Sequence, residues 1–139
     1  SAAQQIMNHF HESLARDEYE ITKIESIQNK YLWNRYCNSK QIMIKAVGKD
    51  NLNEHYVWRA DTDEWMNKCV IQGFRKEHYS NLKNLQYMKG GKSAGICVGK
   101  TASHMVFNDH MMLYCSAICG ESYPLDWKKH NLTDWPCKP

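Results

Sequence analysis

The sequence predicts a single α+β domain over residues 1–139. A length of 139 residues fits one domain. Hydrophobic residues make up 42% of the chain, which is enough to form a core. Helical and strand-like patterns follow one another without the regular strand–helix repeat of a doubly wound parallel sheet, and this favours an α+β architecture.

The first third of the chain predicts two helices with a strand between them. Apolar residues recur at helical spacing over residues 3–15 and again over 31–47, where Gly48 is suited to end the second helix. Residues 19–27 form a short segment whose β-branched content favours a strand. The apolar positions of the two helices are Ile6, Met7, Phe10 and Leu14, and Leu32, Tyr36, Ile42 and Ile44.

A short apolar strand at residues 55–60 is expected to lead into a third helix at 62–72. Asp61 or Thr62 can cap this helix, because their side-chain oxygens accept hydrogen bonds from the free amides of the first turn. Gly73 ends it. The side chains expected to be buried are Trp65, Met66, Cys69 and Val70.

The second half of the chain is less regular. Residues 75–93 are polar and predict a long loop, a kind of segment that is often functional or mobile. Residues 94–98 predict a strand, residues 101–108 a short helix with Thr101 as its N-cap, and residues 111–119 a buried strand.

Four segments carry motifs in a defined order. They read I-T-K-I-E-S-I-Q-N with Y-L-W-N-R-Y, then N-E-H-Y-V-W-R-A-D, then K-S-A-G-I-C-V-G with T-A-S-H-M, and finally L-Y-C-S-A-I-C-G-E-S-Y. Over residues 10–123 this order resembles the catalytic domain of the poly(ADP-ribose) polymerase family. The resemblance implies a compact mixed sheet of the ADP-ribosyltransferase type with packed helices.

The resemblance also implies a later strand that carries a catalytic glutamate. After Tyr123 the tail bears Trp and Pro, and its acids are Asp126 and Asp134, neither of which lies in a strand pattern. We therefore expect a fold that is shortened at the C-terminus, unless the sequence itself stops before that strand.

The NAD site implied by the resemblance has other residues here. Arg59 stands where the family has a ribose-binding His, and Ala60 replaces the Gly after it. Cys97 stands where the family has a Tyr of the nicotinamide pocket, and Met105 stands where it has a Ser that binds the carboxamide. The position of the family Tyr that stacks on the nicotinamide ring falls near Asn108. A nicotinamide ring needs flat faces around it and polar groups on its amide. We therefore expect no NAD binding, no cofactor and no enzymatic activity.

The first hypothesis is a catalytically inactive ADP-ribosyltransferase-like pseudoenzyme that acts as a protein-interaction or scaffold module. One alternative is a mono-ADP-ribosyltransferase with a non-standard site that uses Arg59 and an acid from a partner. Another is an RNA-associated regulatory module, which rests on analogy with the family and gains little from a net charge of +3. For Arg59 and Asp61 a partner-paired charge at the surface or in a cleft is favoured over an anion site, because structural ion pairs outnumber ligand sites.

The candidate interaction surface is formed by Trp127 and Trp135, which could instead cap the core. A protein partner or a homodimer is expected. The six cysteines are widely spaced, so we expect mostly reduced, buried thiols and no metal site. A nucleophilic Cys97 near His104 is the less favoured interpretation of that thiol. With no membrane-length apolar run, the sequence predicts an intracellular protein, nuclear or cytoplasmic.

Overall fold

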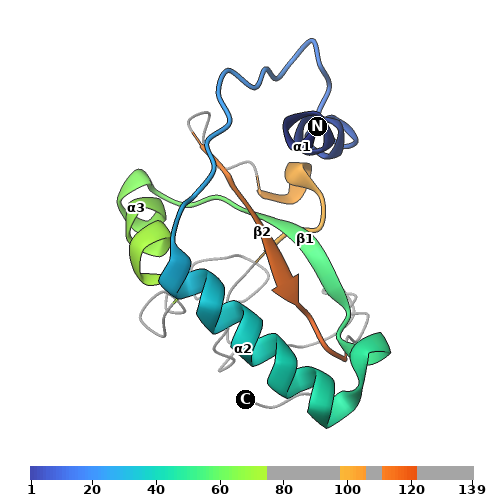
Figure 1. Ribbon diagram of the computed structural model, residues 1–139. Helices are drawn as coiled ribbons and strands as arrows, with labels where there is room; N and C mark the ends of the chain where they lie inside the picture. Colours follow the sequence, from blue (N-terminus) through green and yellow to red (C-terminus); the bar gives the residue numbers. More distant parts are fainter. Residues whose placement is uncertain (75–97, 106–110, 122–139) are drawn as a thin grey trace, which may run out of the picture.

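A computed structural model describes residues 1–74, 98–105 and 111–121 of the chain (Figure 1). Within these residues the architecture is α+β, as predicted, with three α-helices and a two-stranded antiparallel sheet. The predicted loop at 75–93 and most of the predicted strand at 94–98 lie outside the described residues. The elements are α1 (Ala2–His11), α2 (Lys30–Val47), η1 (Lys49–Asn51), β1 (Glu54–Arg59), α3 (Asp63–Gln72), η4 (Ala102–Met105) and β2 (Leu113–Ile118), where η marks a 3₁₀ turn.

The strands β1 and β2 form a ribbon to which the helices attach. Their register runs from Glu54 opposite Ile118 to Arg59 opposite Leu113. On the other side of β1, Trp58 and Gly99 exchange two backbone hydrogen bonds of 2.7 and 2.9 Å. The strand predicted at 111–119 is present as β2, but it is shorter than predicted and its residues are half-buried, so the expectation of a buried strand is wrong.

The helix α1 is shorter than the predicted 3–15. The Ser1 side chain caps its start by accepting from the amide of Gln4 at 3.3 Å. The helix ends at His11, and the chain then turns so that Leu14 is buried with an exposed fraction of 7%. Leu14 therefore joins the core as expected, although it does so from outside the helix.

The predicted strand at 19–27 is absent, and this segment runs as an irregular connection between α1 and α2 (Figure 1). Its Ile21, Ile24 and Ile27 are three residues apart, whereas side chains on one face of a strand are two apart. Ile24 and Ile27 are exposed, and no strand among the described residues pairs with the segment. The β-branched content therefore misled the prediction, because a strand also needs a partner and a shared face.

The helix α2 matches its prediction within one residue. The Asn29 side chain accepts from the amide of Leu32 at 3.1 Å, and the Gly48 amide donates to the carbonyl of Ile44 at 2.9 Å. The helix lies along the surface, since none of its side chains is fully buried. Ile42, predicted to be on the apolar side, is 68% exposed, so that assignment is wrong.

The helix α3 confirms most of its prediction. Of the two candidate caps, the Thr62 side chain accepts from the amide of Trp65 at 3.4 Å. Gly73 follows the last turn and donates its amide to the carbonyl of Cys69 at 2.8 Å. Met66 and Cys69 are buried, whereas Trp65 and Val70 are only half-buried.

Three segments distant in sequence meet in the hydrophobic core. Its buried members are Leu14, Trp58, Ala60 and Ala102. The short helix predicted at 101–108 is described only in its first part, as the 3₁₀ turn η4. Within this turn, the amide of Ser103 donates to the hydroxyl of Ser13 at 3.0 Å. Asn108 and the rest of that prediction lie outside the described residues.

Candidate functional site

The positions that the resemblance assigns to an NAD site begin at the end of β1. Arg59 is the last residue of the strand, and its side chain is 8% exposed. Its guanidinium donates to the carboxylate of Asp61 at 2.6 Å. Ala60, between them, is 2% exposed. Arg59 and Asp61 thus form an ion pair, as the sequence favoured, but the pair is mostly buried and not at the surface.

The other candidate positions are described only in part. The segment with Met105 lies beside this end of β1, because Ala102 of η4 packs in the core with Trp58 and Ala60. The backbone of Met105 belongs to η4, but its side chain is not among those described. Cys97, Asn108, Trp127 and Trp135 lie outside the described residues. The structure therefore joins Arg59 and Ala60 to the η4 segment, and gives no geometry for the remaining positions.

An aromatic cluster adjoins this region, and sequence reasoning missed its centre. His9 of α1 lies against Trp58 and Tyr114, with ring centroids 5.5 and 5.3 Å away. Phe10 packs edge-on against Trp58 at 5.8 Å. The apolar spacing in α1 identified Phe10, but a helix wheel gives no reason to place a polar imidazole against the sheet.

The hydrogen bonds of His9 tie α1 to two distant parts of the chain. Its Nε2 lies 2.9 Å from the carbonyl oxygen of Lys100, and its Nδ1 lies 2.8 Å from the hydroxyl of Tyr114. A carbonyl only accepts, so Nε2 carries the proton, and in the neutral ring Nδ1 accepts from Tyr114. Burial raises the pKa of the Tyr114 hydroxyl, which keeps it a donor at neutral pH.

Trp58 has the one buried, unpaired polar side-chain atom in the described part of the chain. The residue is 3% exposed, and its indole Nε1 has no hydrogen-bond partner. Burying an unsatisfied donor costs about 1–3 kcal/mol. The ring contacts with His9, Phe10 and Tyr114 offset this cost.

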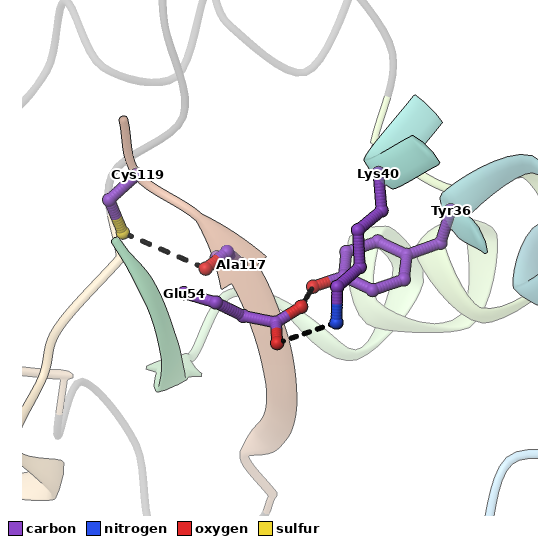
Figure 2. A network of polar contacts seen from close by, with 5 residues as sticks. All are labelled: Tyr36, Lys40, Glu54, Ala117 and Cys119. Carbon is purple, nitrogen blue, oxygen red and sulfur yellow. Dashed lines mark hydrogen bonds and ion pairs between the residues drawn. The ribbon is translucent and has the colours of Figure 1, made fainter. Parts of the chain in front are cut away.

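A polar network joins α2 to the start of β1 (Figure 2). Tyr36 and Lys40 both extend from α2 toward Glu54, where the Tyr36 hydroxyl and the Lys40 ammonium each donate to one carboxylate oxygen. The Lys40 contact is 3.0 Å long. The bonds from Tyr36 and Lys40 lower the pKa of Glu54, and burial together with Glu54 raises the pKa of Tyr36.

This network connects two of the sequence motifs. Tyr36 closes the Y-L-W-N-R-Y segment and Glu54 opens the N-E-H-Y segment after Asn53. Tyr36 and Lys40 are four residues apart, so they share one helix face. That spacing was readable from the sequence, but the position of Glu54 opposite it depended on the tertiary fold.

The thiols of Cys69 and Cys115 are poorly suited to nucleophilic chemistry. Burial raises the pKa of Cys115 to about 11 and also raises that of Cys69. Both groups therefore stay protonated near neutral pH. The four cysteines among the described residues are free thiols, as expected, but Cys69 alone of these is buried, so the expectation of mostly buried thiols is wrong for this part of the chain. The alternative pair of Cys97 and His104 has no described side-chain geometry.

The described residues show no group of three His, Cys, Asp or Glu side chains placed to hold a metal ion. Over the same residues, no helix has the length and apolar character needed to cross a membrane. No protein-family model matches the chain.

Proposed function

We propose that this chain is an ADP-ribosyltransferase-like domain that does not use NAD and acts as a protein-interaction or scaffold module. The proposal rests on the motif resemblance and on one structural observation, the ion pair of Arg59 with Asp61. Arg59 stands where the resemblance calls for a ribose-binding imidazole, and its guanidinium is buried against a carboxylate of the same chain.

The ion pair bears on the choice between this function and a mono-ADP-ribosyltransferase. An active site that uses Arg59 would have to take the guanidinium away from Asp61. Breaking a buried pair leaves an uncompensated charge, at a cost of about 3–5 kcal/mol. Binding of NAD would have to supply that free energy at a site where Ala60 already replaces the family Gly. The inactive module is therefore the better supported function.

The decisive experiment is a calorimetric titration of the purified chain with NAD up to millimolar concentration. We expect no saturable heat, while an active ADP-ribosyltransferase domain in the same buffer gives a normal isotherm. Saturable binding in the micromolar range would refute the proposal. Arg59→His, with Asp61→Asn to avoid an unpaired acid, checks whether the imidazole alone restores binding, and we expect that it does not.

The scaffold part of the proposal needs a partner surface. Trp is frequent at interface hot spots, and Trp127 and Trp135 are the candidates from the sequence. We expect Trp127→Ala and Trp135→Ala, made separately, to weaken self-association or partner capture while the far-ultraviolet circular dichroism stays unchanged. Analytical ultracentrifugation and a pull-down measure this. Retained assembly in both folded variants would place the interface elsewhere.

A further inference from the structure

The helix α2 carries an unusual charge distribution for its length. Lys30, Arg35, Lys40 and Lys45 recur at five-residue intervals, and the helix contains no Asp or Glu. Lys40 turns inward to the Glu54 carboxylate. The other three cations are exposed, and none of them takes part in the ion pairs found among the described residues.

These three cations share one side of the helix. A helix turns by about 100° and rises by about 1.5 Å per residue. Lys45 therefore lies about 60° around the axis from Lys30 and about 80° from Arg35, so the three span an arc of about 140°. Lys30 and Lys45 are about 22 Å apart along the axis, and Tyr31 falls within the same arc. We call Lys30, Tyr31, Arg35 and Lys45 the basic face of α2.

Aromatic and amide side chains accompany the cations. Tyr31 is 67% exposed, and the Arg35 guanidinium carbon lies 5.7 Å from its ring centroid. Trp33, on the adjoining side of the helix, is 61% exposed and stacks on Tyr36 at 5.8 Å with a 22° angle between the rings. Exposed amides within the arc of the basic face are Asn34, Asn38 and Gln41.

We propose that the basic face of α2 binds single-stranded nucleic acid. Cations on a helix without acids attract the phosphates of a backbone, and the exposed ring of Tyr31 offers a flat surface on which a base can stack. An acidic protein would match the same charge, and the stacking role of the Tyr31 ring distinguishes the two in the test below. The net charge of +3 does not oppose this, since nucleic-acid binding depends on the local clustering of cations and not on the total charge of the chain.

This inference is independent of the proposed function, because the basic face lies on α2 and includes neither Arg59 nor Ala60. The NAD titration therefore does not test this inference, and a failure of nucleic-acid binding does not count against the pseudoenzyme proposal.

The test is fluorescence anisotropy of a labelled oligouridylate of about ten nucleotides, a length within the usual site sizes, with the whole chain and varied salt. Each phosphate neutralised on a single strand contributes about −0.7 to the slope of log K against log salt. Three neutralised phosphates predict a slope of about −2. No binding by the parent chain at low salt would overturn the proposal.

A matched pair of triple variants separates this face from net charge. Lys30→Gln with Arg35→Gln and Lys45→Gln is expected to bring the slope close to zero and to weaken low-salt binding about tenfold or more. The control replaces exposed cations away from α2, with Arg16→Gln, Lys23→Gln and Lys68→Gln, and is expected to keep the parent's slope. Equal losses in the two variants would overturn the proposal. If the triple variant fails to fold, Arg35→Gln alone replaces it in the binding measurement.

Tyr31 distinguishes nucleic acid from an acidic protein. Tyr31→Leu is expected to weaken oligouridylate binding about fivefold, because it removes one stacking ring, whereas Tyr31→Phe is expected to bind like the parent. An oligoglutamate of similar length is expected to compete poorly. If the oligoglutamate competes as well as unlabelled oligouridylate, the face recognises acidic protein and the proposal is wrong. If Tyr31→Leu binds like the parent, no base stacks on this ring, and the proposal is also overturned.

Discussion

At the scale of single residues, Glu54 shows how one carboxylate fixes the position of a helix. It accepts hydrogen bonds from Tyr36 and Lys40, which lie one turn apart on α2. These donors favour the ionised form of Glu54 and lower its pKa. Hydrogen bonds to a charged group are stronger than those between neutral groups, although partial exposure of the pair reduces the gain.

Glu54→Gln is expected to lower the free energy of unfolding at pH 7 by about 0.5–1 kcal/mol. Because the folded pKa of Glu54 lies below the ordinary value of 4.5, its stabilising contribution is present above that pH and is lost as the pH falls through the folded pKa. The difference between parent and variant should therefore shrink in acid. Urea unfolding at several pH values measures it.

The control for this prediction is Glu25→Gln. The Glu25 carboxylate also pairs with a lysine, Lys23, at 2.7 Å, but its side chain is 71% exposed. No measurable change is expected for Glu25→Gln, since exposed pairs contribute little. A loss in Glu25→Gln equal to that in Glu54→Gln would show that the α2 network has no special role.

At the scale of elements, Asn29 performs two tasks with one side chain. Its Oδ1 caps α2 by accepting from the Leu32 amide. Its Nδ2 donates to the carbonyls of Val70 and Ile71 near the end of α3, at 2.9 and 3.1 Å. The start of one helix is thereby joined to the end of another, and orphan backbone groups of both helices are satisfied.

Substitution of Asn29 separates the two tasks. Asn29→Ala removes the cap and the tether and is expected to cost about 2 kcal/mol of stability. Asn29→Ser keeps a good capping oxygen but is too short to reach α3, so about 1 kcal/mol of loss is expected. Thermal unfolding followed by circular dichroism measures both. If Asn29→Ser is as stable as the parent, the tether contributes nothing.

At the scale of the whole molecule, the contacts of His9 hold α1 against the ribbon of β1 and β2. The imidazole is hydrogen-bonded to Lys100 and to Tyr114, residues 91 and 105 positions away in sequence. Its ring also packs against Trp58. These contacts, together with the burial of Leu14, join the first segment of the chain to the core.

His9→Ala is expected to lower the free energy of unfolding by about 2 kcal/mol, because it removes two hydrogen bonds and the ring packing. Amides of α1 should exchange hydrogen faster than in the parent, which mass spectrometry can localise. Tyr114→Phe keeps the ring and is expected to lose about 1 kcal/mol. Gln5→Ala, on the exposed side of α1, is the control. Unchanged α1 exchange in His9→Ala would contradict this role.

The sequence by itself determined the α+β class, the ends of α2 and α3, and the strand at β1. Local chemistry accounts for these features: Asn29 and Thr62 supply capping oxygens, and Gly48 and Gly73 adopt backbone angles that suit the ends of helices. It also favoured a structural charge pair over an anion site for Arg59 and Asp61, because structural ion pairs outnumber ligand sites.

Only the tertiary structure decided the remaining features. The segment at 19–27 has strand-like composition but no partner among the described strands, and no local rule shows whether a partner exists. His9 met Tyr114, and Glu54 met Tyr36, across 105 and 18 residues of sequence. Such contacts form because packing brings distant polar groups into places where they must be satisfied. The spacing of apolar residues predicts which side of a helix is apolar, but it does not predict which part of the chain that side will contact.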